Sequence, residues 1–163
     1  MRRMAKFVFC VMIIALLPPL AVADAPAPAF DLPALEGEQR IALKDLRGKV
    51  VYLDFWASWC GPCRQSLPAL NALYHKLAEL DFEIIAINLD AEANDALRFL
   101  ERYPVDYPVL VDRSGATPQA YALTGLPTSV LIDQHGVLVA SFEGFNPEHL
   151  VKLEQAVRIL LAE

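Results

Sequence analysis

The stretch DFWASWCGPCRQSLPAL, residues 54–70, contains two cysteines with only two residues between them. An apolar run, VVYLDF at residues 50–55, precedes Cys60, and regularly spaced leucines follow Cys63. A pair at this spacing can be a reacting dithiol, half of a metal site or a small structural disulfide. The residues around the pair decide among these three.

The residues on either side of the pair predict a strand and then a helix. Residues 50–55 are apolar and β-branched at their start, which is typical of a buried strand. After Cys60, leucines recur at steps of three and four residues and form one apolar helix face. Pro68 lies inside this pattern and should kink the helix. The leucines are Leu67, Leu70, Leu73, Leu77 and Leu80.

The rest of the chain predicts one α/β domain. Leu97 and Leu100 should be the inward residues of a further helix, and Asn146 should cap the last helix with Pro147 in its first turn. The order is β-α-β-α, then a hairpin and a closing helix, which predicts a central mixed sheet flanked by helices. The expected strands are 82–90, 109–111, 128–132 and 137–142, and the expected helices are 92–103, 117–123 and the segment after Pro147.

Residues 1–23 have the layout of a secretory signal peptide. Basic residues precede eleven apolar ones at 7–17, and an A-x-A cleavage pattern ends at Ala23. The alternative is an uncleaved anchor over residues 7–23, but a spanning helix needs ~20 apolar residues. We therefore expect an exported, periplasmic protein, with inner-membrane anchoring by that segment as the alternative.

The remainder of the chain divides into a short tether and the domain. Residues 24–29, DAPAPA, should be extended and mobile, and residues 30–163 should fold. The chain has 14 basic and 20 acidic residues and no basic block in the domain, so we expect no nucleic-acid partner. Cys10 would be lost with the signal peptide, and an oxidising compartment would allow Cys60 and Cys63 to form a disulfide.

The strand-to-helix context gives the two cysteines different roles. Cys60 falls at the start of the helix, where unpaired N–H groups and the helix dipole stabilise a thiolate. Cys63 lies about one turn further in and should be shielded. Cys60 would then attack a client disulfide, and Cys63 would resolve the mixed disulfide. Gly61 permits a close approach, and Pro62 suits the first helical turn.

The other interpretations of the pair fit less well. Zinc needs four ligands, and the three scattered histidines lack the usual spacing. Haem attachment needs CxxCH, but Arg64 follows Cys63. A structural disulfide that closes so short a loop adds little stability through chain entropy. We therefore prefer redox chemistry, and we expect neither a cofactor nor a required metal. The histidines are His75, His135 and His149.

The active-site stretch is similar to that of a known superfamily. FWASWCGPC at residues 55–63, with Trp59 directly before the first cysteine, resembles the signature of the thioredoxin superfamily. LTGLPTSVLIDQHG at residues 123–136 and the segment that leads from Phe30 into the first core strand resemble its exported TlpA/ResA-like branch. The resemblance covers nearly all of residues 24–163 and implies a thioredoxin-like fold.

The resemblance also implies a site for client proteins. The Leu126-Pro127 peptide would be cis and would face the cysteines, with the Leu126 backbone offered to a client strand. The alternative is that Pro127 merely starts a strand. Trp59 should flank the sulfurs, whereas Trp56 should pack in the core. The expected substrate-binding residues are Trp59, Gly61, Pro62, Leu126 and Pro127.

Asp54 is a polar residue inside an apolar run. If it is buried, its pKa should rise, and it could relay a proton to or from Cys63. The resemblance supports this role, because thioredoxin has an aspartate here; the alternative is a hydrogen-bonded carboxylate that faces water. Ala86 replaces a buried lysine of thioredoxin, and Ser66 replaces a glutamate of many ResA-like proteins. The proton relay should therefore be tuned differently in this chain.

These observations predict an exported thiol–disulfide oxidoreductase that works as a reductant. The Gly-Pro spacer matches thioredoxin, whose reduction potential is low. The resemblance implies disulfide-bearing client proteins, such as apocytochrome c or proteins with copper-site cysteines, and a membrane-embedded thiol electron donor. The alternatives are a disulfide-forming oxidant or isomerase and a redox-inert binding module. We expect a monomer.

Overall fold

We describe residues 25–162 of a computed structural model of the chain. The predicted signal peptide at residues 1–23 lies outside the described residues. Within residues 25–162, no helix is long and apolar enough to cross a membrane.

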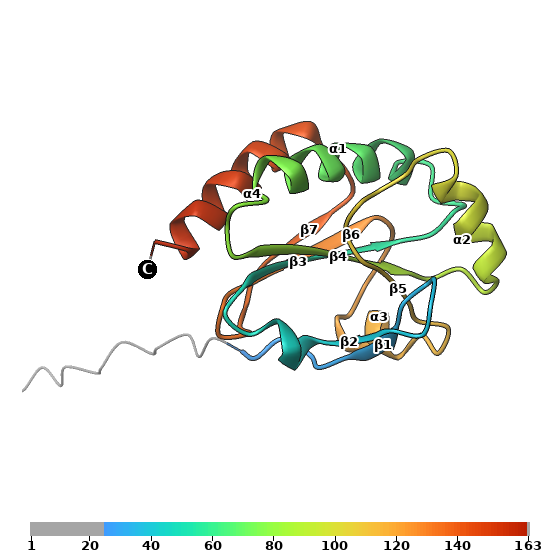
Figure 1. Cartoon of the computed structure of the whole chain (residues 1–163), viewed down its shortest axis with the longest axis horizontal. Coiled ribbons are helices and arrows are strands. Elements are labelled where there is room, and N and C mark those ends of the chain that lie inside the picture. The colour runs from blue at the N-terminus through green and yellow to red at the C-terminus, as the bar shows by residue number, and fades with distance from the viewer. Residues whose placement is uncertain (1–24, 163) are drawn as a thin grey trace, which may run out of the picture.

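A five-stranded mixed sheet runs through the centre of the domain (Figure 1). The strand order is β5-β4-β3-β6-β7. β3 is parallel to β4, and β4 to β5, whereas β6 and β7 are antiparallel to their neighbours. The sheet confirms the predicted α/β class. The strands are β3 (Val50–Trp56), β4 (Phe82–Asn88), β5 (Val109–Val111), β6 (Thr128–Ile132) and β7 (Leu138–Glu143).

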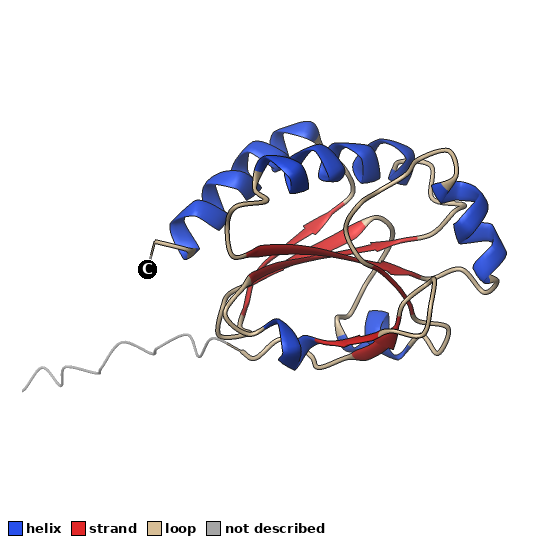
Figure 2. Ribbon diagram, viewed as in Figure 1, coloured by secondary structure: helices blue, strands red, loops and turns tan. Residues whose placement is uncertain are grey.

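Helices cover one face of the sheet, and short elements cover the other (Figure 2). α1 and α4 lie side by side over the first face. The β1–β2 hairpin, η1 and α3 lie beneath the second. Each face has its own hydrophobic cluster. These elements are β1 (Asp31–Pro33), β2 (Arg40–Ala42), η1 (Leu43–Leu46), α1 (Cys63–Lys76), α2 (Ala93–Leu100), α3 (Ala116–Ala120) and α4 (Pro147–Leu160).

β3 is central because its sequence suits a strand that is covered on both faces. All seven of its residues are buried, as expected of a continuous apolar run between neighbouring strands. Asp54 is the one charged residue type in this strand, and its side chain is nevertheless fully buried. At the end of β3, the chain enters the cysteine loop and then α1. The fold therefore places both cysteines at the end of its most buried strand.

The helices agree with the sequence pattern except in α2. α1 continues through Pro68 as one helix. Asn146 caps α4, as predicted, by accepting a hydrogen bond from the Glu148 N–H. In α2, the prediction that Leu97 and Leu100 face inward is only partly right: Leu100 is half-buried and packs against the core, but the fully buried residues of the helix are Ala96 and Phe99. The Phe99 ring packs against Trp56 at 5.1 Å, and this aromatic contact sets which helix face is buried.

Residues 25–29 are extended but attached to the domain, so the prediction of a mobile tether needs correction. The Ala27 N–H donates to the Gly136 carbonyl (2.9 Å), and the Leu138 N–H donates to the Ala25 carbonyl (3.2 Å). The Ala27 side chain is buried. Two backbone hydrogen bonds and a buried methyl group hold this segment beside the turn that precedes β7.

Candidate active site

The cysteine pair lies in a tight turn that leads directly into α1. The two sulfurs form a disulfide with a Cα–Cα distance of 5.4 Å. The Cys63 N–H donates to the Cys60 carbonyl (3.2 Å), and α1 begins at Cys63. Cys60 is 4 % exposed and Cys63 is not exposed at all. Of the two cysteines, only Cys60 therefore has any exposed surface.

The residues next to Cys60 along the chain are exposed. Trp59 is 69 % exposed, which is unusual for a tryptophan. Gly61 and Pro62 are also exposed. Trp56, in contrast, is fully buried, as predicted. Exposed aromatic side chains are enriched where proteins contact other proteins.

The Leu126–Pro127 peptide bond is cis, as the resemblance implies. Pro127 is buried and directly precedes β6, which pairs with β3 so that Thr128 faces Phe55. This register places the proline near the end of β3 from which the cysteine loop leaves. Among the described residues, neither the N–H nor the carbonyl of Leu126 has a hydrogen-bond partner. Both groups are free to pair with an extended segment of a client.

Asp54 is fully buried beneath this site. The Ser129 hydroxyl donates to its Oδ1 atom at 2.7 Å. Burial raises the pKa of Asp54 to about 7, although the hydrogen bond from Ser129 lowers it. The β3–β4 register places Ala86 beside Asp54, so no lysine balances the carboxylate from that strand. A carboxyl group with a pKa near neutrality can take up and release a proton during a reaction at physiological pH.

Two further polar residues, which we did not predict from the sequence, hold the loop before Cys60. Asp90 accepts hydrogen bonds from the Ser58 N–H (2.9 Å) and the Ser58 hydroxyl (2.9 Å). The Asn88 side chain donates to Asp90 at 2.8 Å. Asn88 ends β4 and Asp90 follows it, at the same edge of the sheet as the end of β3. Their position could have indicated a role at the site, because polar residues at the carboxyl ends of adjacent parallel strands often contribute to functional sites.

We expect Asp90→Ala to destabilise the protein by about 1–3 kcal/mol, because it leaves the Ser58 N–H and the Asn88 amide without an acceptor. Urea unfolding of the oxidised protein would measure this change. Asp90→Asn is the matched control, since it keeps one acceptor oxygen and should recover much of the lost stability. Equal stability of Asp90→Ala and the parent protein would show that these bonds do not hold the loop.

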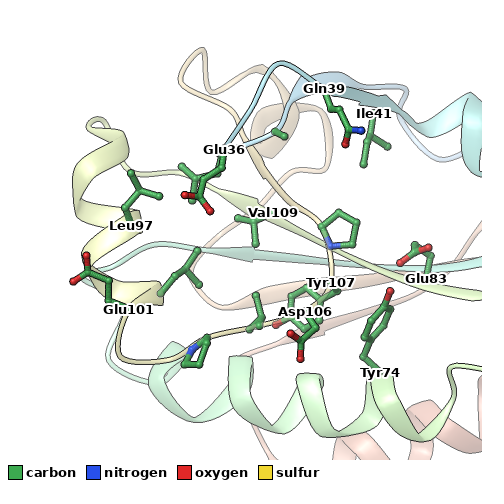
Figure 3. Close-up of a pocket in the computed structure, with 16 residues that line it drawn as sticks. Glu36, Gln39, Ile41, Tyr74, Glu83, Leu97, Glu101, Asp106, Tyr107 and Val109 are labelled. Atoms are coloured by element: carbon green, nitrogen blue, oxygen red, sulfur yellow. The ribbon is translucent and has the colours of Figure 1, made fainter.

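A groove lies along the β5 edge of the sheet, away from the cysteine pair (Figure 3). Its volume is about 720 Å³, and Figure 3 shows Leu97 of α2, Glu101 directly after that helix, Tyr74 of α1 and Asp106 on its walls. None of the predicted site residues lines this groove. The groove therefore lies apart from the predicted site residues.

Comparisons with known proteins agree with this geometry. Residues 22–160 match the family model described as Redoxin. The thiol-disulfide oxidoreductase ResA of Bacillus thuringiensis subsp. konkukian is 40% identical over 118 residues, which are 72% of this chain and 68% of that protein. ResA of Halalkalibacterium halodurans is 38% identical over 133 residues, which are 82% and 75% of the two chains.

Solved structures show the same similarity. A crystal structure from Chlorobium tepidum, assigned as a thiol:disulfide interchange protein DsbE, superposes with a TM-score of 0.78 at 45% identity. It covers 83% of this chain and 95% of its own. The thioredoxin domain of a thiol-disulfide oxidoreductase from Bacteroides vulgatus superposes with a TM-score of 0.74 at 25% identity, over 82% and 96% of the chains.

Proposed function

The chain belongs to the Redoxin family and is a thiol–disulfide oxidoreductase, and from this we propose that it works as a reductant of disulfides in client proteins. The observation that carries the proposal is the Cys60–Cys63 pair, of which only Cys60 reaches the surface. The Gly-Pro spacer supports the reductive direction, because the same spacer in thioredoxin accompanies a potential of about −270 mV.

We infer a reaction in two thiol–disulfide exchanges. The Cys60 thiolate attacks one sulfur of the client disulfide, a Cys60–client bond forms, and the other client sulfur leaves as a thiolate. The Cys63 thiol then loses its proton and attacks the Cys60 sulfur. The Cys60–Cys63 bond forms, and the second client sulfur leaves as a thiolate. The client gains two electrons, both from the cysteine pair, and its two thiolates take up protons from water.

Asp54 would serve this reaction as a proton acceptor for Cys63. Cys63 is buried, so its proton cannot leave directly to bulk water. Asp54 is also buried and has a pKa of about 7, so it is partly ionised near neutral pH. The carboxylate form would accept the proton when Cys63 attacks, and the carboxylic acid form would return it when the pair is reduced again.

The client would bind at the edge formed by Trp59, Gly61, Pro62 and the Leu126–Pro127 peptide. The two unpaired backbone groups of Leu126 would pair with an extended client segment, and the exposed Trp59 ring would cover its apolar side chains. We propose clients in an oxidising compartment, with apocytochrome c and proteins that carry copper-site cysteines as candidates. This placement rests on the signal-peptide pattern in residues 1–23, with residues 30–163 as the exported domain.

A reductant in such a compartment needs a source of electrons. We propose a membrane-embedded thiol protein, which would reduce the Cys60–Cys63 disulfide by the reverse of the exchanges above. The domain itself would need no cofactor, because all four sulfur atoms of the overall reaction come from the two proteins.

The equilibrium reduction potential of the Cys60–Cys63 pair tests the reductive direction. We expect a value below about −230 mV in defined thiol buffers at pH 7. The fraction of oxidised protein can be followed by alkylation of free thiols. A variant with both cysteines replaced by serine gives the background. A value above about −150 mV would contradict the proposal and favour an oxidant or an isomerase.

A further inference from the structure

A small cavity lies beneath the active site, against the buried carboxyl group. Its volume is about 10 Å³, close to the space that one water molecule needs. Asp54 of β3, Ser66 of α1, Pro127 and Ser129 at the start of β6, and His149 of α4 all contribute to its wall. The cavity therefore lies where the elements of the proposed active site meet α4.

Two polar atoms next to this cavity have no hydrogen-bond partner among the described residues. They are Asp54 Oδ2 and His149 Nδ1, and both are buried. The other carboxyl oxygen of Asp54 is already bonded to the Ser129 hydroxyl. A buried polar atom without a partner costs about 1–3 kcal/mol, and native proteins usually satisfy such atoms with protein groups or an ordered water. Both atoms belong to residues that line the same cavity, so one water can serve both.

We propose that this cavity holds one water molecule hydrogen-bonded to Asp54 Oδ2 and His149 Nδ1, and that His149 is the outlet through which the buried carboxyl group exchanges its proton with solvent. The inference rests on the proposed role of Asp54 as the proton acceptor for Cys63. His149 touches neither the sulfurs nor the client and acts through Asp54, so it is a positioning residue.

The position of His149 suits an outlet, because its two nitrogen atoms lie in different surroundings. The residue is only partly buried, and of its ring nitrogens only Nδ1 is both buried and unpartnered. Among the described residues Nε2 has no hydrogen-bond partner either, so this nitrogen keeps some exposed surface. The ring packs against Phe142 of β7 at 5.7 Å between centroids, and the Asn146 cap fixes the start of α4 one turn earlier. These contacts hold the imidazole between the cavity and the surface.

No other basic side chain can take this role at the cavity. Among the described residues that line it, the titratable ones are Tyr52, Asp54 and His149. Burial raises the pKa of Tyr52 far above the neutral range. Burial and the nearby Asp54 charge both raise the pKa of Tyr107 as well. From β4, Ala86 contributes no charge.

The proton balance of the outlet is simple. When Cys63 attacks, its proton passes to the Asp54 carboxylate, which becomes a neutral acid. The acid then donates through the water to Nδ1 of a neutral imidazole, and the Nε2 proton leaves to solvent. Each step moves one proton and no electrons. The carboxylate is restored, and the imidazole returns to neutrality as its other tautomer. When the pair is reduced again, the same transfers in reverse protonate Asp54, which returns the proton to Cys63, and restore the first tautomer.

The experiment is a titration of the Asp54 side chain in the oxidised protein, purified after expression of the full-length chain. The carbon-13 signal of its carboxyl group is followed by NMR from pH 4 to 10. In His149→Leu the bridge is lost, and we expect the pKa of Asp54 to rise by about one unit. In His149→Asn a side-chain amide can still bond the water, so the rise should be less than half as large. His135→Asn, the same change on an exposed turn, is the matched control and should leave the titration unchanged.

Kinetics and crystallography complete the test. Single-turnover oxidation of the reduced protein by a small disulfide should be about tenfold slower in both His149 variants at pH 7, because asparagine cannot carry the proton. Added imidazole buffer should restore part of that rate in the variants only. A high-resolution crystal structure of the parent protein should show a water bonded to both atoms, whether or not the variants fold.

An unchanged Asp54 titration in His149→Leu, or an empty cavity in that crystal structure, would overturn the inference. Unchanged kinetics in both variants would overturn the outlet role. The titration and the crystal structure use the oxidised protein without any client. A high reduction potential would contradict the reductant proposal, but the titration and the crystal structure could still be interpreted without it.

Discussion

Cys60→Ser is expected to abolish disulfide reduction, with a loss of roughly a thousandfold or more. A serine hydroxyl is almost entirely protonated at pH 7 and cannot form an exchangeable bond with a client sulfur. Cys60 is also the sulfur that a client can reach, because Cys63 has no exposed surface. Reduction of a protein disulfide such as that of insulin, in the presence of a chemical reductant, would measure the loss.

Cys63→Ser distinguishes the two roles in the same assay. Its Cys60 can still attack, but nothing resolves the product, so a mixed disulfide with the client should accumulate and turnover should stop. Gel electrophoresis without reducing agent would reveal that adduct, which also provides a way to isolate natural clients. Gln65→Ala, on the exposed face of α1, is a control that keeps both sulfurs. An adduct formed by Cys60→Ser rather than by Cys63→Ser would reverse the assignment.

Asp54→Asn is expected to stabilise the oxidised protein above pH 7 by as much as about 4 kcal/mol. The pKa of Asp54 rises from its ordinary value of 3.8 to about 7 because burial disfavours the charged form. Between these two values the folded state binds more protons than the unfolded state. Stability therefore falls as the pH rises from about 4 to 7, and the whole penalty is present above pH 7. A neutral asparagine of the same shape removes that penalty.

Urea unfolding at pH 5 and pH 8 would measure this difference. The gain in Asp54→Asn should be small at pH 5 and large at pH 8, and the Cys63 step should be slower at both. The reason is that asparagine cannot accept a proton. Asp133→Asn, a hydrogen-bonded aspartate of the turn before β7, controls for the loss of one negative charge. An equal gain at both pH values would show that Asp54 is not the titrating group.

The sequence alone was sufficient for the parts of the fold that depend on local pattern. The strand at 128–132 has the predicted limits, because a run of β-branched and apolar residues ends at clear turn signals. The cysteine pair was also predictable, since two residues between the sulfurs restrict their geometry whatever the rest of the chain does. The position of Asp54 inside an apolar run favoured its burial but left a carboxylate that faces water as the alternative, and the structure shows the buried side chain.

The missed features depend on contacts between distant segments. Asp90 and Ser58 are 32 residues apart, and they meet only because β3 and β4 end at the same edge of the sheet. His149 approaches the cavity because α4 packs beside α1. In α2, periodicity alone predicted that Leu97 and Leu100 face inward. The contact between the Phe99 and Trp56 rings instead determines which face of the helix is most buried. Such pairings cannot be seen before the strand order is known.

The attachment of residues 25–27 beside the turn at residues 133–137 fixes how the domain would sit on anything joined to its amino-terminal end. That turn lies next to the start of β3, whereas Cys60 follows the end of the same strand. Seven strand residues span about 20 Å. A bead, an electrode or a lipid bilayer coupled ahead of residue 25 would therefore leave the sulfur-bearing edge pointing away from it. The reactive end would remain accessible without a long spacer.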